Sequence, residues 1–244
     1  MAMTLSVCCL LLVLAGDGRG EVAAFELEEA TIESIHRALA TGELTSRRLV
    51  ELYLRRIASV DPTLHAIIEL DPDGALAADA AARSSSGVLP PLHGVPVLLK
   101  DNIAAAGDGG VLNATAGSLA MVGSRPARDA GVVERLRRAG AVLLGTASLS
   151  EWCNFRGPGI PADWSPRGGQ GRNPYVPSAT TCSSSSGSAI AAAANMAAVT
   201  IGTETDGSIM CPSSYNSVVG IKPTVGLTSS AGVIIISQRM DTIG

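Results

Sequence analysis

The sequence predicts an α/β fold in which a mixed β-sheet core is flanked by helices. Short apolar segments of strand type alternate with amphipathic helical segments. The apolar runs at residues 95–99 and 142–144 are continuous, as in strands that are covered on both faces. With 46% hydrophobic and 16% charged residues, the 244-residue chain can build a sizeable core, since a disordered chain needs the opposite balance.

The first predicted elements are two helices. Thr31 is a typical N-cap for a helix over residues 32–40, which Gly42 ends. Thr45 opens a second helix, which Asp61-Pro62 ends. One face of this second helix is apolar and carries Leu49, Leu52, Tyr53, Ile57 and Val60. We expect the two helices to form a packed hairpin that covers the sheet.

The remaining elements follow in alternation. The pattern predicts strands at 65–70, 95–99, 142–144 and 199–201, helices at 74–83, 129–139 and 189–198, and a loop at 84–91. Residues 155–188 are rich in Gly, Pro, Ser and Asn and lack apolar periodicity. A long irregular stretch is either disordered or functional, and its position between buried elements favours a loop that wraps a site.

The first twenty residues have the form of a secretory signal peptide. An apolar run at 5–15 is too short to span a bilayer, and Gly16, Gly18 and Gly20 follow it. We expect residues 1–20 to be removed and residues 21–244 to be secreted with no stable membrane span. The alternative is a buried N-terminal helix or an uncleaved anchor. The sequon at 113–115 is compatible with secretion.

Composition also narrows the partners. A net charge of -4 without any basic run argues against nucleic acid. Beyond the leader, Cys153, Cys182 and Cys211 show neither a CxxC pair nor metal-ligand spacing. They are expected to be free thiols or to form at most one disulfide, and no metal site is predicted.

Two polar segments and one lysine are the candidates for chemistry. Ser183 to Ser188 precede a helix, whose N-terminal N–H groups favour a developing negative charge. Gly207 permits a turn after the 199–201 strand in which successive N–H groups converge beside Ser208. Lys100 follows the 95–99 strand, and a buried lysine has a lowered pKa and can act as a general base. Each feature taken alone also fits an ordinary cap, turn or surface lysine.

Together these segments resemble the amidase signature family. The lysine motif corresponds to residues 94–102, and the Gly/Ser-rich signature corresponds to residues 183–188 and 202–209. Further similarity covers residues 145–152, 219–224 and 226–228. The form of residues 204–208 is most similar to plant and bacterial amidases related to the glutamyl-tRNA amidotransferase A subunit. The chain corresponds to the N-terminal half of such proteins, so the fold is expected to be incomplete.

The resemblance implies a Ser-Ser-Lys mechanism for hydrolysis of a carboxylic acid amide. Ser208 would be the nucleophile, and Ser184, preceded by a cis peptide bond, would pass its proton to neutral Lys100. An acyl-enzyme would form, with no cofactor and no metal. The substrate would be a small-molecule or peptide amide. The implied oxyanion hole consists of the backbone N–H groups of Thr205, Asp206, Gly207 and Ser208.

Two alternatives remain beside the active amidase. The chain could be a truncated, catalytically inactive fragment or pseudoenzyme, because family members are roughly twice as long. It could also be a subunit that delivers ammonia for transamidation, although the predicted leader argues against that role. The sequence does not define the oligomeric state.

Overall fold

The computed structural model describes residues 25–76, 90–106 and 112–244. The predicted signal peptide at 1–20 lies outside these residues, so secretion stays a prediction. Residues 72–76 are helical, and the rest of the helix predicted at 74–83 also lies outside the described part. Within that part, no helix has both the length and the apolar character needed to cross a bilayer.

The described part of the chain contains both helices and strands. The helices are α1 (Ile32–Thr41), α2 (Ser46–Leu64), α4 (Gly131–Arg138), α5 (Ser186–Ala193) and α6 (Met210–Tyr215), with 3-10 turns η1 (Leu119–Met121) and η2 (Glu151–Asn154). The strands are β1 (Ile67–Leu70), β2 (Pro96–Lys100), β3 (Val142–Ala147), β4 (Trp164–Ser165), β5 (Gly169–Gln170), β6 (Val199–Ile201), β7 (Thr203–Glu204) and β8 (Thr242–Ile243).

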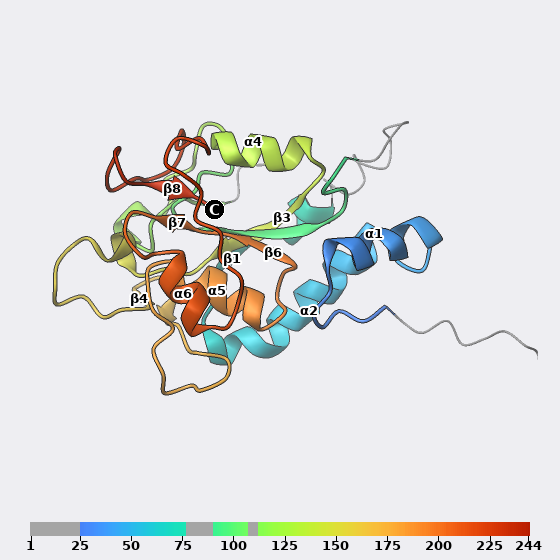
Figure 1. Ribbon diagram of the computed structural model, residues 1–244, viewed down its shortest axis with the longest axis horizontal. Coiled ribbons are helices and arrows are strands. Elements are labelled where there is room, and N and C mark those ends of the chain that lie inside the picture. The colour runs from blue at the N-terminus through green and yellow to red at the C-terminus, as the bar shows by residue number, and fades with distance from the viewer. Residues whose placement is uncertain (1–24, 77–89, 107–111) are drawn as a thin grey trace, which may run out of the picture.

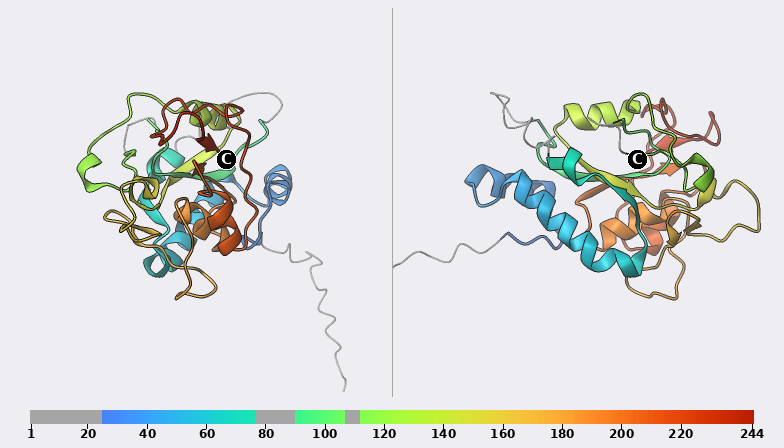
Figure 2. Two further views of the ribbon diagram at one scale, coloured as in Figure 1. Left: turned by 60° about the vertical axis from the view of Figure 1, so that its left-hand side comes forward. Right: turned by 180° about the vertical axis from the view of Figure 1, so that it is seen from behind.

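Four strands form the central sheet in the order β1-β3-β2-β6. Strand β2 pairs in parallel with both β3 and β6, whereas β1 runs antiparallel to β3. Helix α4 lies on one side of the strands, and α2 lies on the other (Figures 1 and 2). The sheet is therefore mixed and covered on both faces, which confirms the predicted α/β architecture.

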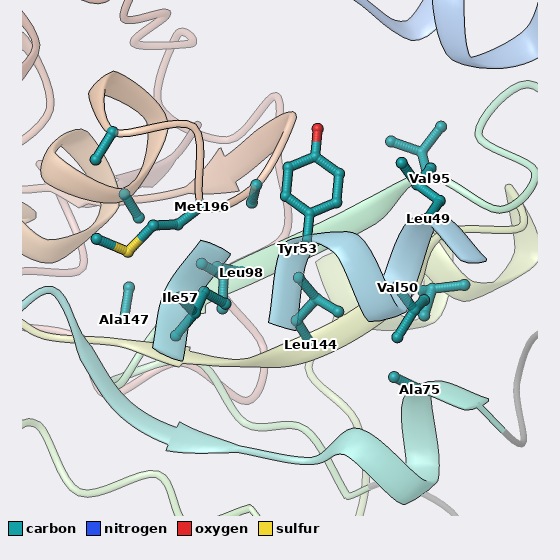
Figure 3. Close-up of a cluster of buried hydrophobic side chains, with 14 of the residues drawn as sticks. Leu49, Val50, Tyr53, Ile57, Ala75, Val95, Leu98, Leu144, Ala147 and Met196 are labelled. Carbon is teal, nitrogen blue, oxygen red and sulfur yellow. The ribbon is translucent and has the colours of Figure 1, made fainter. Parts of the chain in front are cut away.

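The larger core lies between the sheet and helices α1, α2 and α5. Figure 3 shows Tyr53 and Ile57 of α2 beside Leu98 of β2 and Leu144 of β3. Leu98 and Leu144 have no exposed surface. Val97 and Leu99 of β2 face the second core, which α4 covers through Val133. Side chains two apart on a strand share a face, so Lys100 points to the same side as Leu98, the side of α5.

The two N-terminal helices largely follow the prediction. The Thr31 side chain accepts a hydrogen bond from the N–H of Ser34, and Gly42 ends α1 in the left-handed conformation with φ 74°. Helix α2 does not end at Asp61-Pro62 but continues to Leu64. Proline in a last turn removes only one helical N–H, and the carbonyl of Asp61 still accepts a hydrogen bond from the N–H of His65 at 2.9 Å.

The helix predicted at 189–198 is shifted toward the N-terminus. Helix α5 begins at Ser186, so Ser186, Gly187 and Ser188 form its first turn. It ends at Ala193, and Asn195 has a left-handed φ of 56°. Low helix propensity favours a loop at these serines, but burial of this first turn outweighs propensity. Strand β3 likewise extends beyond the predicted 142–144, to Ala147.

Candidate active site

The three parallel strands place one candidate residue at their carboxyl edge. Lys100 is the last residue of β2 and pairs with Ala147, the last residue of β3. Its side chain has no exposed surface. Open α/β sheets bind ligands outside this edge, where loops from neighbouring strands meet. Lys100 therefore lies at the position where a site is expected, and it is buried rather than solvated.

Ser184 reaches the same place from the serine-rich segment. It lies two residues before the start of α5, and the Ser183–Ser184 peptide bond is cis, as the resemblance implied. Ser208 follows β7 and Gly207, which has a left-handed φ of 75°. Both serine side chains are buried, with 1% and 9% of their surface exposed.

The three side chains form a continuous chain of polar contacts. The ammonium nitrogen of Lys100 donates to Ser184 Oγ at 2.8 Å and to the carbonyl of Thr203 at 3.0 Å. Ser184 Oγ donates to Ser208 Oγ at 3.0 Å. These distances are normal for hydrogen bonds. The structure thus brings Lys100, Ser184 and Ser208 together although up to 108 positions separate them along the chain.

Burial controls the protonation of Lys100. Removal from water disfavours the ammonium form and lowers the pKa of Lys100 below its ordinary value of 10.5. Cys153, Asp241 and Glu204 act in the opposite direction, because negative charge on these neighbours stabilises the ammonium. The net direction is downward, so the amine loses its proton more readily than a solvated lysine does.

The turn that carries Ser208 is fixed by two carboxylates. Glu204 accepts hydrogen bonds from the backbone N–H groups of Ile209 at 2.6 Å and Met210 at 2.9 Å. The hydroxyl of Thr205 donates to Asp241 at 2.6 Å, which connects the turn to the C-terminal segment. The backbone geometry beside Ser208 is therefore supported from both ends of the turn.

The N–H groups of this turn have no acceptor in the described part of the chain. This holds for Thr205, Asp206, Gly207 and Ser208, the four positions that the family resemblance implied for an oxyanion hole. Thr205 and Gly207 are half-buried and Asp206 is exposed, so water or a ligand can accept hydrogen bonds from this turn. The turn consequently presents donors that are free to bind an external oxygen.

Gly187 controls how closely α5 approaches the sheet. A Cβ atom at this position would lie 2.4 Å from both the backbone N and the O of Ser148, and 2.5 Å from the carbonyl of Ala66. The N–H of Gly187 donates to the Ser148 carbonyl at 3.0 Å. Because all of these contacts involve backbone atoms, no side-chain rotation can make room for a methyl group.

Gly187→Ala is expected to destabilise the fold by about 3 kcal/mol and to separate Ser184 from Lys100, because α5 must move away from β3. Urea unfolding measures the loss of stability. Ala189→Ser, at another buried position of α5, serves as the comparison for a change of one heavy atom. An unchanged midpoint for Gly187→Ala would contradict the close approach.

Asp101 anchors the end of β2 on its other side. Its carboxylate accepts hydrogen bonds from Thr115 Oγ1 at 2.5 Å and from the N–H of Gly117 at 3.0 Å. The guanidinium of Arg167 lies 3.6 Å away and also forms an ion pair with Glu69. Burial raises the pKa of Asp101 to about 6, against the lowering effect of these donors. This network positions the residue that directly follows Lys100.

Sequence reasoning missed several neighbours of the site. Cys153 lies beside Lys100. The side-chain nitrogen of Asn102 donates a hydrogen bond to Cys153 Sγ at 3.7 Å. Asp241 and Glu204 were not recognised as supports of the turn.

Cys182 and Cys211 form a disulfide, which agrees with the predicted upper limit of one bridge, although the spacing of the cysteines could not identify the pair. Among the described residues, no group of His, Cys, Asp or Glu could hold a metal ion.

The sequon gives no support for secretion. The side-chain nitrogen of Asn113 donates to Glu69 at 2.7 Å, and its side-chain oxygen accepts from the N–H of Gly123. Thr115, the third residue of the sequon, is fully buried. A glycan on Asn113 would have to replace these contacts, so the sequon is better explained as part of the Asp101 network.

Comparison with known proteins identifies the family. Residues 48–244 match the family model described as Amidase. The chain belongs to the amidase family. It is 58% identical to a probable amidase of Arabidopsis thaliana over 226 residues, a match that covers 91% of this chain and 44% of that protein. It is also 38% identical to the A subunit of the glutamyl-tRNA(Gln) amidotransferase of Chloroflexus aurantiacus, covering 90% of this chain and 44% of that protein.

Solved amidase structures share the fold. The native peptide amidase of Stenotrophomonas maltophilia superposes with a TM-score of 0.85 at 53% sequence identity, covering 90% of this chain and 45% of that one. An amidase family protein from Bacillus anthracis gives a TM-score of 0.84 at 35% identity, covering 89% of this chain and 44% of that one. The resemblance to amidases is therefore confirmed, and the chain spans less than half the length of these relatives.

Proposed function

We propose that this chain hydrolyses carboxylic acid amides with Ser208 as nucleophile, Ser184 as proton relay and Lys100 as base. The observation that carries this proposal is the continuous path from the Lys100 amine through Ser184 Oγ to Ser208 Oγ, with steps of 2.8 and 3.0 Å. Among the described residues, no other serine of the 183–188 segment accepts a hydrogen bond from a buried amine.

The first step forms an acyl-enzyme. With Lys100 neutral, the hydroxyl hydrogens rotate so that Ser208 donates to Ser184 and Ser184 donates to the amine. Ser208 Oγ then attacks the amide carbon while its proton passes to Ser184 and the Ser184 proton passes to Lys100. When the C–N bond breaks, the same path returns a proton to the leaving amine. Water attacks the resulting ester by the same route and releases the acid.

The oxygen that gains charge requires hydrogen-bond donors. We assign that role to the unpaired N–H groups of Thr205, Asp206, Gly207 and Ser208. Each such donor contributes about 3 kcal/mol to stabilising the transition state. The left-handed conformation of Gly207 supports this assignment, because it allows successive N–H groups to turn toward one point.

Amides at the carboxyl end of peptides are the first substrates to test. A 53% identical solved structure is that of a peptide amidase, and the match covers 90% of this chain. The purified chain is incubated with an amidated peptide and with the same peptide as a free acid, and ammonia is measured. In parallel, an alkyl phosphonofluoridate is added, and peptide mass spectrometry locates the adduct. We expect ammonia only from the amide and one adduct on Ser208.

The competing proposal is an amidase-like protein without activity. It is supported by exposed apolar side chains beside β6, where 92% of Val219 and 71% of Ile221 are accessible. Surface of this kind normally contacts further protein. A chain that unfolds cooperatively but gives neither ammonia nor an adduct on Ser208 would support this alternative and exclude the first proposal.

A further inference from the structure

A single disulfide joins the two segments that carry the serines. Cys182 lies two residues before Ser184, and Cys211 lies three residues after Ser208. The sulfur atoms are bonded, and the two Cα atoms are 5.8 Å apart. The ring that the bridge closes contains α5, β6 and β7 together with both hydroxyls. The disulfide therefore links the two segments close to the contact between Ser184 and Ser208.

The noncovalent contacts between these two segments are few. The N–H of Ser185 donates to the carbonyl of Ser208 at 3.2 Å, and Asn216 donates from its side chain to the carbonyl of Thr181 at 2.9 Å. Helix α6, which begins at Met210, two residues after Ser208, has only six residues. A helix this short has little stability of its own, so its position depends on tertiary contacts and on the bridge.

Chemical access to the bridge is open. Cys182 and Cys211 are both partly exposed, whereas Ser184 is buried. A soluble dithiol can therefore reach the sulfur atoms without unfolding the site. Reduction consumes two electrons and two protons: the dithiol is oxidised to its cyclic disulfide, and Cys182 and Cys211 become two thiols.

We propose that the Cys182–Cys211 disulfide is a redox-sensitive positioning device that holds Ser208 Oγ within hydrogen-bonding distance of Ser184 Oγ. This inference rests on the proposed function, because it concerns the same proton path. The steps of this path are 2.8 and 3.0 Å, so a shift of Ser208 Oγ by about 0.5 Å would take its contact with Ser184 outside the normal hydrogen-bond range. Cys182 and Cys211 act through the serines and do not touch the reacting atoms.

The test uses the full chain and an alkyl phosphonofluoridate as probe. The rate constant for labelling Ser208 at saturating probe and the probe concentration for half-maximal rate are measured before and after treatment with dithiothreitol. We expect reduction to lower the saturating rate by about tenfold to a hundredfold and to leave the half-saturating concentration unchanged. Reoxidation should restore the rate.

Two variants serve as controls. The double variant Cys182→Ser, Cys211→Ser should label at the slow rate with or without dithiol. Cys153→Ser keeps the bridge, and the ratio of its labelling rates with and without dithiol should equal that ratio in the parent chain. Equal labelling rates of the oxidised and reduced parent would overturn the inference. Loss of cooperative unfolding on reduction would also overturn it, in favour of a general stabilising role. Absence of labelling in the oxidised chain would instead refute the proposed function.

Discussion

Ser208→Ala is expected to abolish both the phosphonofluoridate adduct and ammonia release, with a loss of more than about 10³-fold. Removal of a serine nucleophile eliminates the covalent route, and the remaining groups only bind and polarise the amide. Folding should be preserved, because Ser208 Oγ makes a single side-chain hydrogen bond, to Ser184. Thermal unfolding of both proteins verifies that the fold is intact.

Ser186→Ala is the matched control for this experiment. Ser186 belongs to the same serine cluster and is buried to the same degree as Ser184, but its hydroxyl has no hydrogen-bond partner among the described residues. We expect this variant to label at the parent rate. If Ser208→Ala retained activity while Ser186→Ala lost it, the nucleophile would have to be reassigned.

Lys100→Met is expected to reduce the rate of Ser208 labelling by about 10³-fold or more, since a thioether accepts no proton at neutral pH. In the parent chain the labelling rate should rise with pH as the Lys100 ammonium loses its proton. Because burial lowers the pKa of Lys100, this rise should occur below pH 10.5. A pH series of labelling rates for both proteins measures the effect.

Stability provides a second measurement on the same variant. The folded chain binds a proton at Lys100 less tightly than the unfolded chain, so the stability of the parent should rise with pH up to about 10.5. Lys100→Met lacks this dependence. The free energy of unfolding of Lys100→Met should exceed that of the parent chain most at low pH, and this excess should shrink as pH rises. A difference that does not depend on pH would mean that Lys100 is not buried in its neutral form.

Additional groups limit how far the pKa of Lys100 falls. Asp241 and Glu204 both stabilise the ammonium. Each also holds the turn around Ser208, through Thr205 and through the N–H groups of Ile209 and Met210. The same carboxylates therefore connect the protonation of Lys100 to the geometry of the turn that carries Ser208.

Local signals in the sequence were sufficient for most of the fold. Thr31 and Gly42 define α1 because caps act through neighbouring backbone groups, and continuous apolar runs identify β2 and β3 because strands covered on both faces need them. Errors occurred where tertiary contacts outweigh local preference. Pro62 remains helical because a proline in the last turn removes only one helical N–H. Helix α5 begins at Ser186 because burial of its first turn outweighs low helix propensity.

Residue types and local patterns were enough to predict the α/β class and to single out Lys100, the serine-rich segment and the turn at Gly207, because neighbouring residues carry that information. The choice of Ser184 and Ser208 as partners of Lys100 came from the family resemblance. The folded arrangement was needed to establish that Lys100 is buried, that Cys182 pairs with Cys211, and that Asp241 supports the turn. These properties depend on distances between segments far apart in the chain. Such distances follow from how the strands pair and how α5 packs, and no local pattern encodes them.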